Sequence, residues 1–426
     1  MTILLISLVI LLFFGVPIAY AIGMSSLLYF ALYQPDLMQI LPQRMFFGFN
    51  SYTLIALPLF ILMGFLMNES GITARLLNFC MMFVGRLRGG LGLVNVGASM
   101  IFGGISGSST SDTASIGSIL IPEMEKRGYA KQFSAGITVA SSTMGMIIPP
   151  SIPIVLYAIV AEESVGQLFL GGLIPGVLIG LFQFVITMVL AKKRGYPKED
   201  VHPPVKEIVK ETFVSSYVLL MPVLIVGVVV FGVATPTESS AIAVLYAAII
   251  GFVFTRKLKW PALRESVRQT VLVSSKIMII IALSQLYIYV LTLEKLPEDL
   301  TNFLASLDLG PTGFMLIFAA IVLVFGTFID VSPAILLLTP IFLPAARDLG
   351  VSPVQFGVVL VSGLAVGACT PPVGNCLNVC SAISRMGIGA IFVGALPFLA
   401  GNVIVMVLCI LFPDLVLWLP ELQMGN

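Results

Sequence analysis

Long runs of apolar residues with almost no charge constrain this chain more than any other feature. Several reach the roughly 20 residues that cross the core of a bilayer as an α-helix. They cover residues 3–14, 52–67, 168–191, 214–233, 239–254, 271–293, 312–329 and 388–412. Hydrophobic residues make up 58% of the 426 residues and charged residues only 10%, far fewer than in a soluble domain. The sequence therefore predicts an all-α integral membrane protein that crosses the bilayer many times.

The N-terminal apolar run continues past Gly15 and Pro17 to about residue 33. It lacks the basic residues that begin a signal peptide, so we expect it to stay in the protein as a membrane span.

Signatures of enzymes are missing from the sequence. No glycine is followed by lysine, which excludes a P-loop, and the only histidine, His202, lies in a polar stretch outside the apolar body. The five cysteines lie in apolar stretches, where small buried side chains are the expected role. The net charge of +1 gives no reason to expect a nucleic-acid partner. We therefore do not expect an enzyme.

A unit of about 50 residues occurs twice, at a constant offset of 222 residues. Pro122 corresponds to Pro344 at this offset, and the tandem prolines Pro149–Pro150 correspond to Pro371–Pro372. The same offset relates Gly104, Gly128 and Gly145 to Gly326, Gly350 and Gly367. So many matches at one offset indicate an internal repeat.

Each repeat predicts a helical hairpin followed by a broken helix. An apolar segment leads into a polar tip, 104–112 in the first repeat and 326–333 in the second, and a return segment of about ten residues runs to a proline. Such short pieces suit a re-entrant hairpin. The next helix, 131–161 or 354–384, should break at its tandem prolines, because proline removes a backbone donor and clashes with the preceding turn.

Basic residues cluster in short segments that the positive-inside rule places in the cytoplasm. These segments are 86–88, 126–131, 192–194 and 256–268. If the spans between them are followed, the first hairpin opens to the cytoplasm and the second opens to the outside, next to the acidic stretch 294–308. The two repeats are therefore predicted to have inverted topology, which is a plan of secondary transporters.

The hairpin tips and helix breaks hold the candidate binding residues, and we expect them to meet near the bilayer midplane. Hydroxyls and unwound carbonyls suit a small alkali cation, and half-helix N-termini suit an anion. Asp112 and Asp330 are the only carboxylates expected at this depth, where charges are costly and usually functional. Capping of a helix by Ser111 next to Asp112, or tight packing of small residues, is the alternative explanation.

Several motifs together resemble the large membrane subunit (the M or DctM-like subunit) of TRAP transporters. They are Phe102–Ser109 continuing through Ile121–Met124 and Lys126–Tyr129, then Ile148–Ser151, Thr235–Glu238 and Gly367–Gly374. The resemblance covers nearly the whole chain and is greatest to the sialic-acid branch. It implies an elevator-type transporter of the bacterial inner membrane that takes up a small organic acid with sodium ions, the acid being sialic acid or a C4-dicarboxylate. The implied partners are a small four-helix membrane subunit (Q-type) and a periplasmic substrate-binding protein (P-type).

The resemblance also implies binding residues. A first sodium site would include Ser106, Ser108, Gly145 and Ile148. A second would include Gly326, Gly367 and Thr370. The organic anion would bind near Ser108, Asp112 and Ser151, with Asp330 as a further candidate.

We predict that residues 89–165 and 310–387 form a transport unit, with one hairpin and one broken helix in each part. Residues 1–88 and 166–309 would supply scaffold helices and two arms, and 388–426 a C-terminal helix and tail. A stand-alone sodium/dicarboxylate symporter and an ion channel are the alternative functions.

Overall fold

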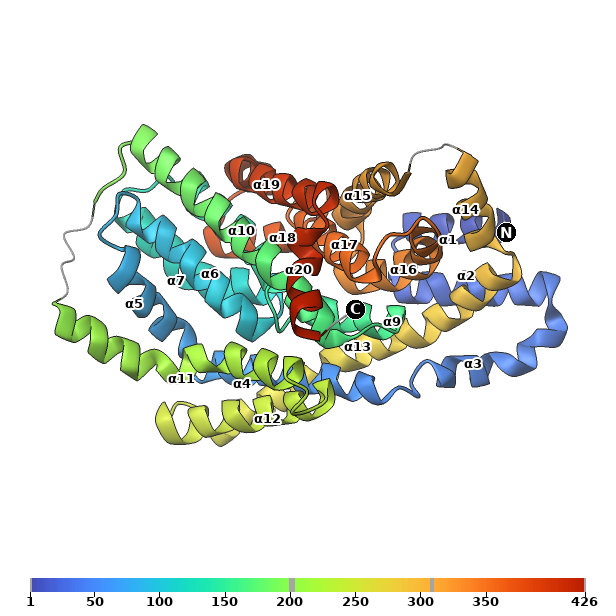
Figure 1. The fold of residues 1–426 in the computed structure, drawn as a ribbon, viewed down its shortest axis with the longest axis horizontal. Helices are drawn as coiled ribbons and strands as arrows, with labels where there is room; N and C mark the ends of the chain where they lie inside the picture. The colour runs from blue at the N-terminus through green and yellow to red at the C-terminus, as the bar shows by residue number, and fades with distance from the viewer. Residues whose placement is uncertain (1, 199–203, 307–309, 425–426) are drawn as a thin grey trace.

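The computed structural model describes residues 2–198, 204–306 and 310–424, and these fold almost entirely into helices (Figure 1). Seven helical stretches in this part are long and apolar enough to cross a membrane: Tyr52–Glu69, Val165–Lys193, Pro236–Phe254, Trp260–Leu293, Gly310–Phe328, Val331–Asp348 and Ile388–Leu411. The predicted all-α membrane class is confirmed. His202 lies outside the described residues.

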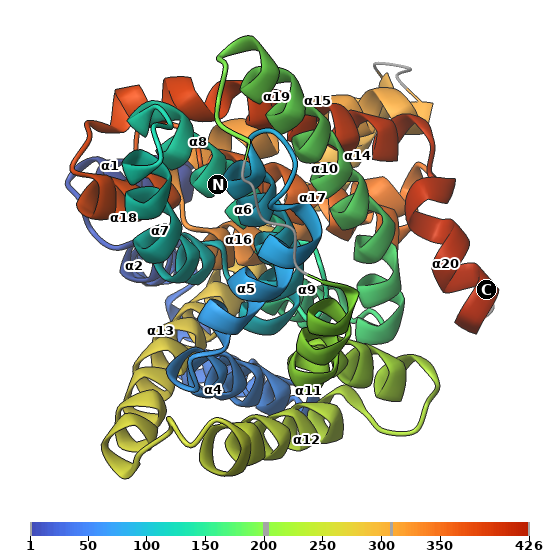
Figure 2. The same ribbon diagram turned by 90° about the vertical axis from the view of Figure 1, so that its left-hand side faces the viewer.

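One layer of the molecule lies along the lower edge of Figures 1 and 2. Its helices are α4 (Ala56–Glu69), α11 (Val205–Val230), α12 (Pro236–Ile249) and α13 (Trp260–Leu293). α4 packs between α12 and α13, and the π-helix η4 (Ile250–Phe254) extends α12. A capping box fixes the start of α12, because the Thr235 hydroxyl accepts from the Glu238 amide at 3.2 Å while the Glu238 carboxylate accepts from the Thr235 amide at 2.8 Å.

Residues 2–33, which the sequence predicts to be retained as a membrane span, form two helices. α1 (Thr2–Phe13) ends just before Gly15, whose φ of 77° is readily adopted only by a residue without Cβ. α2 (Ile18–Tyr33) then packs against α1 and against α13. The hydroxyl of Tyr29 donates a hydrogen bond to Glu294 at the end of α13, which attaches this helix pair to the layer of α4, α11, α12 and α13. The chain continues through η1 (Pro35–Ile40), α3 (Leu41–Phe47) and η2 (Tyr52–Ile55) to α4.

The first repeat follows α5 (Ile72–Val84) and contains a hairpin and a broken helix, as predicted. The hairpin is α6 (Gly90–Ser106) and α7 (Ser109–Lys126). The broken helix is α8 (Lys131–Ser142), η3 (Thr143–Met146) and α9 (Ile152–Ala161), and it is followed by α10 (Val165–Lys193).

The second repeat follows α14 (Leu296–Ser306) and has the same order of elements. Its hairpin is α15 (Gly310–Phe328) and α16 (Val331–Asp348), and its broken helix is α17 (Pro353–Gly367) and α18 (Asn375–Ser384). α19 (Ile388–Leu411) corresponds to α10, and α20 (Asp414–Met424) ends the described chain.

The hairpin arms are longer than predicted. The return arms α7 and α16 each have 18 residues rather than about ten, because Pro122 and Pro344 lie inside these helices and do not end them. Each proline is four residues from the last residue of its helix, so the helix loses a hydrogen bond but continues for one more turn.

Contacts between the repeats establish their inverted topology. Arg347, in the last turn of α16, forms an ion pair of 2.7 Å with Glu163 and donates to the Ala161 carbonyl at 3.1 Å, at the end of α9. On the opposite side, the Gln132 side chain at the start of α8 donates to the Ala390 carbonyl at the start of α19. The second hairpin therefore opens at the end of the molecule where the first broken helix finishes, opposite the opening of the first hairpin.

One extensive helix contact joins the two repeats, where α19 packs along α8. Gly136 of α8 lies against the backbone of Gly394 and Ala395 of α19, so a Cβ at Gly136 would overlap main-chain atoms. A main-chain neighbour cannot rotate away as a side chain can. Gly136 is therefore required by the packing of the two helices.

We predict that Gly136→Ala lowers the melting temperature of the purified protein, because overpacking of this kind costs about 1–3 kcal/mol. The matched control is Gly389→Ala, an exposed site on α19 where a Cβ would meet no atom within 4 Å. This variant should melt at or slightly above the wild-type temperature. Equal melting temperatures for the two variants would show that α8 and α19 are not held this closely.

Candidate functional site

The tip of the first hairpin is bound to the break of its own repeat. Gly107 turns the chain between α6 and α7 with a φ of 61°, and its carbonyl accepts a hydrogen bond of 3.3 Å from the Ile152 amide at the start of α9. Gly103 lies against Gly145, since a Cβ at Gly103 would come within 2.8 Å of the Gly145 Cα. Only glycine allows the hairpin to approach the broken helix this closely.

Asp112 lies inside this contact with 1% of its surface exposed. The Ser106 hydroxyl donates a hydrogen bond to its Oδ1. Its Oδ2 points to the place that a side chain at Gly145 would fill, and it has no hydrogen-bond partner among the described residues. The Ser108 amide donates to the Ser106 hydroxyl at 3.2 Å. The structure therefore brings together Ser106, Ser108 and Gly145 of the predicted first sodium site, and adds Asp112 to them.

Ile148 and Ser151 complete the break but do not join this cluster by hydrogen bonds. The Ile148 amide donates to the Met144 carbonyl at 2.8 Å, and the Ile148 side chain packs against Gly176 of α10. Ser151 is buried and caps α9 by accepting from the Ile154 amide at 3.3 Å, while its hydroxyl donates to the Met146 carbonyl. Both functions of the Ser151 hydroxyl are thus used to satisfy the break.

The second hairpin is bound to the second break in a related way. The Val373 amide donates to the Thr327 carbonyl at 3.2 Å, and a Cβ at Gly326 would come within 3.0 Å of the Gly367 Cα. The Thr370 hydroxyl donates to the Val366 carbonyl at 2.9 Å. The structure therefore brings together Gly326 and Gly367 of the predicted second sodium site, with Thr370 one turn further along.

Asp330 is exposed, in contrast to Asp112. Its Oδ1 accepts from its neighbour's amide, that of Val331, at 2.9 Å and from the Asn375 side chain at 3.0 Å, so Asp330 caps α16 and holds the start of α18. Among the described residues no hydrogen bond joins Asp330 to Ser108, Asp112 or Ser151. Of the four predicted substrate residues, Ser108 and Asp112 thus lie at the first tip, Ser151 at the first break and Asp330 at the second tip.

The two tips do not bond to each other in the part of the chain that the structure describes. Instead, the first tip meets the second break, because the Cys376 thiol donates to the Ser109 hydroxyl at 3.1 Å. The breaks themselves also meet, since the Cys369 thiol lies 3.4 Å from the Val139 carbonyl of α8.

A cavity of about 420 Å³ lies between the first tip and α4. One wall carries hydroxyls of the tip and of α7, and the other carries Asn68. The lining hydroxyls belong to Ser106, Ser108, Thr110, Ser111 and Ser115. The Ser115 hydroxyl donates to the Asn68 side chain at 2.9 Å. Its lining combines these polar groups with apolar side chains such as Ile61 and Phe65, and it contains no charged side chain.

A second cavity of about 350 Å³ shares Asn68, Ala114 and Ser115 with the first, so the two form one polar groove along α7. The groove continues past Ser118 to Gly71, which lies beside the Lys257 side chain. Asn68 and Ser115 were not predicted from the sequence as site residues. A spacing of three or four residues between Ser108, Ser111, Ser115 and Ser118, which places them on one helical face, could have indicated this wall.

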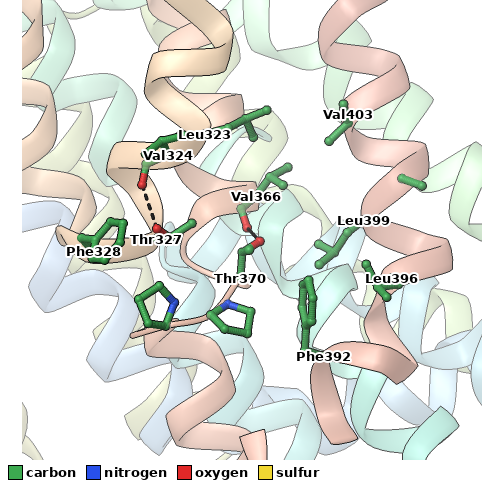
Figure 3. Close-up of a pocket in the computed structure, with 13 residues that line it drawn as sticks. Leu323, Val324, Thr327, Phe328, Val366, Thr370, Phe392, Leu396, Leu399 and Val403 are labelled. Atoms are coloured by element: carbon green, nitrogen blue, oxygen red, sulfur yellow. Dashed lines mark hydrogen bonds between the residues drawn. The ribbon is translucent and has the colours of Figure 1, made fainter. Parts of the chain in front are cut away.

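An apolar pocket of about 560 Å³ lies beside the second tip, between α15, the second break and α19 (Figure 3). Thr327 and Thr370 are its polar residues, and Figure 3 shows both hydroxyls bonded to carbonyls of their own helices, at 2.8 Å and 2.9 Å. Both hydroxyls of this pocket are therefore already engaged as hydrogen-bond donors.

A comparison of sequences with known families decides the class of this protein. The family model described as "Tripartite ATP-independent periplasmic transporter, DctM component" matches residues 5–415. The chain belongs to this family. The resemblance found in the sequence is therefore confirmed, and the protein is a transport permease rather than an enzyme.

Relatives in this family are named for different transported substrates. The sialic acid TRAP transporter large permease protein SiaM of Vibrio cholerae is 36% identical over 418 residues, which are 97% of each chain. The C4-dicarboxylate TRAP transporter large permease protein DctM of Pseudomonas aeruginosa is 36% identical over 401 residues, which are 94% of each chain. The crystal structure of the Alcanivorax borkumensis YdaH transporter has the same fold, with a TM-score of 0.67 over 89% of both chains at 13% identity.

We predict that Ser115→Cys in the purified protein reacts with a water-soluble maleimide, because its side chain lines both parts of the polar groove. The rate can be followed by the mass of the intact protein. The five native cysteines are buried and should add little background.

Thr113→Cys is the matched control for this reaction. Thr113 lies two residues away on α7 and is fully buried, so its thiol should remain as unreactive as the native cysteines. Similar slow rates for both variants would contradict a groove that is open to water.

Proposed function

We propose that this chain is the large membrane subunit of a sodium-coupled, binding-protein-dependent uptake system for a small organic acid. The observation that carries the proposal is the buried Oδ2 of Asp112, which has no hydrogen-bond partner in the described part of the chain and faces Gly145 beside the Ser106 hydroxyl. A buried carboxylate oxygen without a partner is costly, and a bound cation removes that cost.

The first tip has the chemistry of a sodium site. Sodium prefers oxygen ligands, and unwound backbone at a helix break offers carbonyls in addition to the side-chain oxygens. Ser106, Asp112 and the carbonyls of Ser108, Gly145 and Ile148 would hold the ion. The ion supplies positive charge at the tip, and the protein supplies the oxygens and excludes water.

The second proposed sodium site uses the equivalent positions of the second repeat. Gly326, Gly367 and Thr370 would hold the ion with backbone and hydroxyl oxygens. The Thr370 hydroxyl already donates to the Val366 carbonyl, which leaves its lone pairs free for a cation. Asp330, held by Asn375, would add negative charge at the edge of this site.

We place the organic acid in the polar groove at the first tip, in contact with Ser108. Its hydroxyls and the Asn68 amide suit a carboxylate or a polyhydroxylated acid, and the lining has no lysine or arginine to neutralise the anion. Sodium ions beside the groove would supply that charge. Asp112 would contribute indirectly, by holding the sodium ion that attracts the anion. Ser151 would contribute by satisfying the backbone of the adjacent break.

The groove runs from the first tip to the side of Lys257, in a basic cluster that the positive-inside rule places in the cytoplasm. This supports an inward-open state in a multi-pass protein of the bacterial inner membrane. For alternating access we propose an elevator movement of the hairpins and broken helices against the layer of α4, α11, α12 and α13.

The partners follow from the tripartite family and from exposed apolar surface. Leu220 and Val223 of α11 and Leu245 of α12 are each more than half exposed. We propose that the small membrane subunit covers this surface, with lipid around the rest, and that a periplasmic binding protein delivers the acid from the outside.

Uptake into proteoliposomes tests the proposal. With the chain, the small subunit and the binding protein present, an inward sodium gradient should drive accumulation of an acid from a panel that includes sialic acid and C4-dicarboxylates. A proton gradient without sodium should not. Uptake by the chain alone would favour a stand-alone symporter, and uptake driven by protons alone would contradict sodium coupling.

The variant Asp112→Asn sharpens this test, because it keeps the shape of the side chain and removes its charge. We expect the sodium concentration for half-maximal uptake to rise at least about tenfold, which corresponds to about 1.4 kcal/mol. Asp348→Asn, at an exposed carboxylate at the end of α16, is the control and should behave as wild type.

A further inference from the structure

Two buried side-chain amides meet beside the first helix break. Asn402 of α19 accepts a hydrogen bond of 2.9 Å from Gln183 of α10 and donates one of 2.9 Å to the Thr143 hydroxyl. Gln183 also donates to the Ala140 carbonyl at 3.0 Å, and Thr143 donates to the same carbonyl at 2.7 Å. All four residues are at most 1% exposed. We call Thr143, Gln183 and Asn402 the amide cluster.

None of these residues lines the polar groove or either tip. The Oε1 of Gln183 also lacks a hydrogen-bond partner among the described residues. Buried amides in an apolar body are costly, so general packing does not account for the cluster. The position of the cluster suggests a role instead. Ala140 and Thr143 lie where α8 continues into the 3-10 helix η3, just before Gly145.

A second set of hydrogen bonds holds the same turns of α8 from the side of α6. Asn95 donates to the Thr138 hydroxyl at 2.7 Å and accepts from the Ser141 hydroxyl at 3.0 Å. Ser99 donates to the Ser141 hydroxyl at 2.9 Å. The last turns of α8 are thus held by directional hydrogen bonds from α6, α10 and α19.

The second repeat lacks this arrangement. At the offset of 222 residues, Asn95, Thr138, Ser141, Thr143 and Gln183 correspond to Ile317, Leu360, Gly363, Ala365 and Val405. These five positions of the second repeat carry apolar residues or glycine, and apolar packing tolerates shifts that hydrogen bonds do not. The buried, hydrogen-bonded side chains at these five positions are therefore particular to the first repeat, which indicates a requirement that the second repeat does not share.

We propose that Thr143, Gln183 and Asn402 are positioning residues for the first sodium site. They fix the turn that leads to Gly145, so that its backbone faces Asp112 before the ion arrives. This inference rests on the proposed sodium coupling. The amide cluster gives the first site a preformed geometry, and preformed geometry raises affinity because less has to be ordered on binding.

The test is sodium-dependent thermal stabilisation of the purified chain, titrated with sodium against choline. Thr143→Val keeps the shape of the side chain but removes its hydroxyl, and Asn402→Leu removes the donor to Thr143. Both should raise the half-saturating sodium concentration about fivefold to tenfold. Thr143→Ser keeps the hydroxyl and should restore the wild-type value within about twofold.

Thr187→Val is the matched control. Thr187 is fully buried on α10, one turn from Gln183, and its hydroxyl donates only to the Gln183 backbone carbonyl at 2.7 Å. Its loss should leave the half-saturating sodium concentration unchanged, whatever its effect on the melting temperature in choline.

Two results distinguish a failure of this inference from a failure of the proposed sodium coupling. If sodium stabilises the wild type and Thr143→Val melts lower in choline with an unchanged half-saturating concentration, the cluster is only structural and the inference is overturned. If the wild type does not respond to sodium at all, sodium coupling itself is contradicted. Should Asn402→Leu fail to fold, the comparison of Thr143→Val with Thr143→Ser decides.

Discussion

Two broken helices place backbone groups inside an apolar body, where water cannot satisfy them, and the neighbouring elements are arranged around this constraint. The Gly107 carbonyl accepts from the Ile152 amide at the first break, and the Thr327 carbonyl accepts from the Val373 amide at the second. An unsatisfied backbone group in hydrocarbon costs several kcal/mol, so each hairpin must stay with its break.

The same constraint extends to the elements around the breaks. The first tip contacts the second break through Ser109 and Cys376, and Gln183 and Asn402 attach α10 and α19 to the end of α8. If the hairpins and broken helices move, these contacts make α10 and α19 part of the moving body. We therefore extend the transport unit proposed from the sequence, 89–165 and 310–387, by these two helices.

Local signals in the sequence predicted much of this arrangement. The offset of 222 residues located both hairpins and both breaks, because tandem prolines and tip glycines are local requirements of the backbone. The length of the return arms was mispredicted, since Pro122 and Pro344 are tolerated near the ends of helices. Contacts between residues far apart in the sequence could not be predicted. Asn68 lines the polar groove from α4, which is distant in the sequence from α7. Asp112 is buried because Gly145, on the broken helix, packs against it.

Distances between spin labels test most directly whether the hairpins and broken helices travel as one body. Ile119 of α7, Leu245 of α12 and Val393 of α19 have exposed side chains that can carry labels. Between Ile119 and Leu245 the account predicts two distance populations, whose proportions change with sodium and substrate, while the distance between Ile119 and Val393 stays constant. A single unchanged distance between Ile119 and Leu245 under all conditions would contradict it.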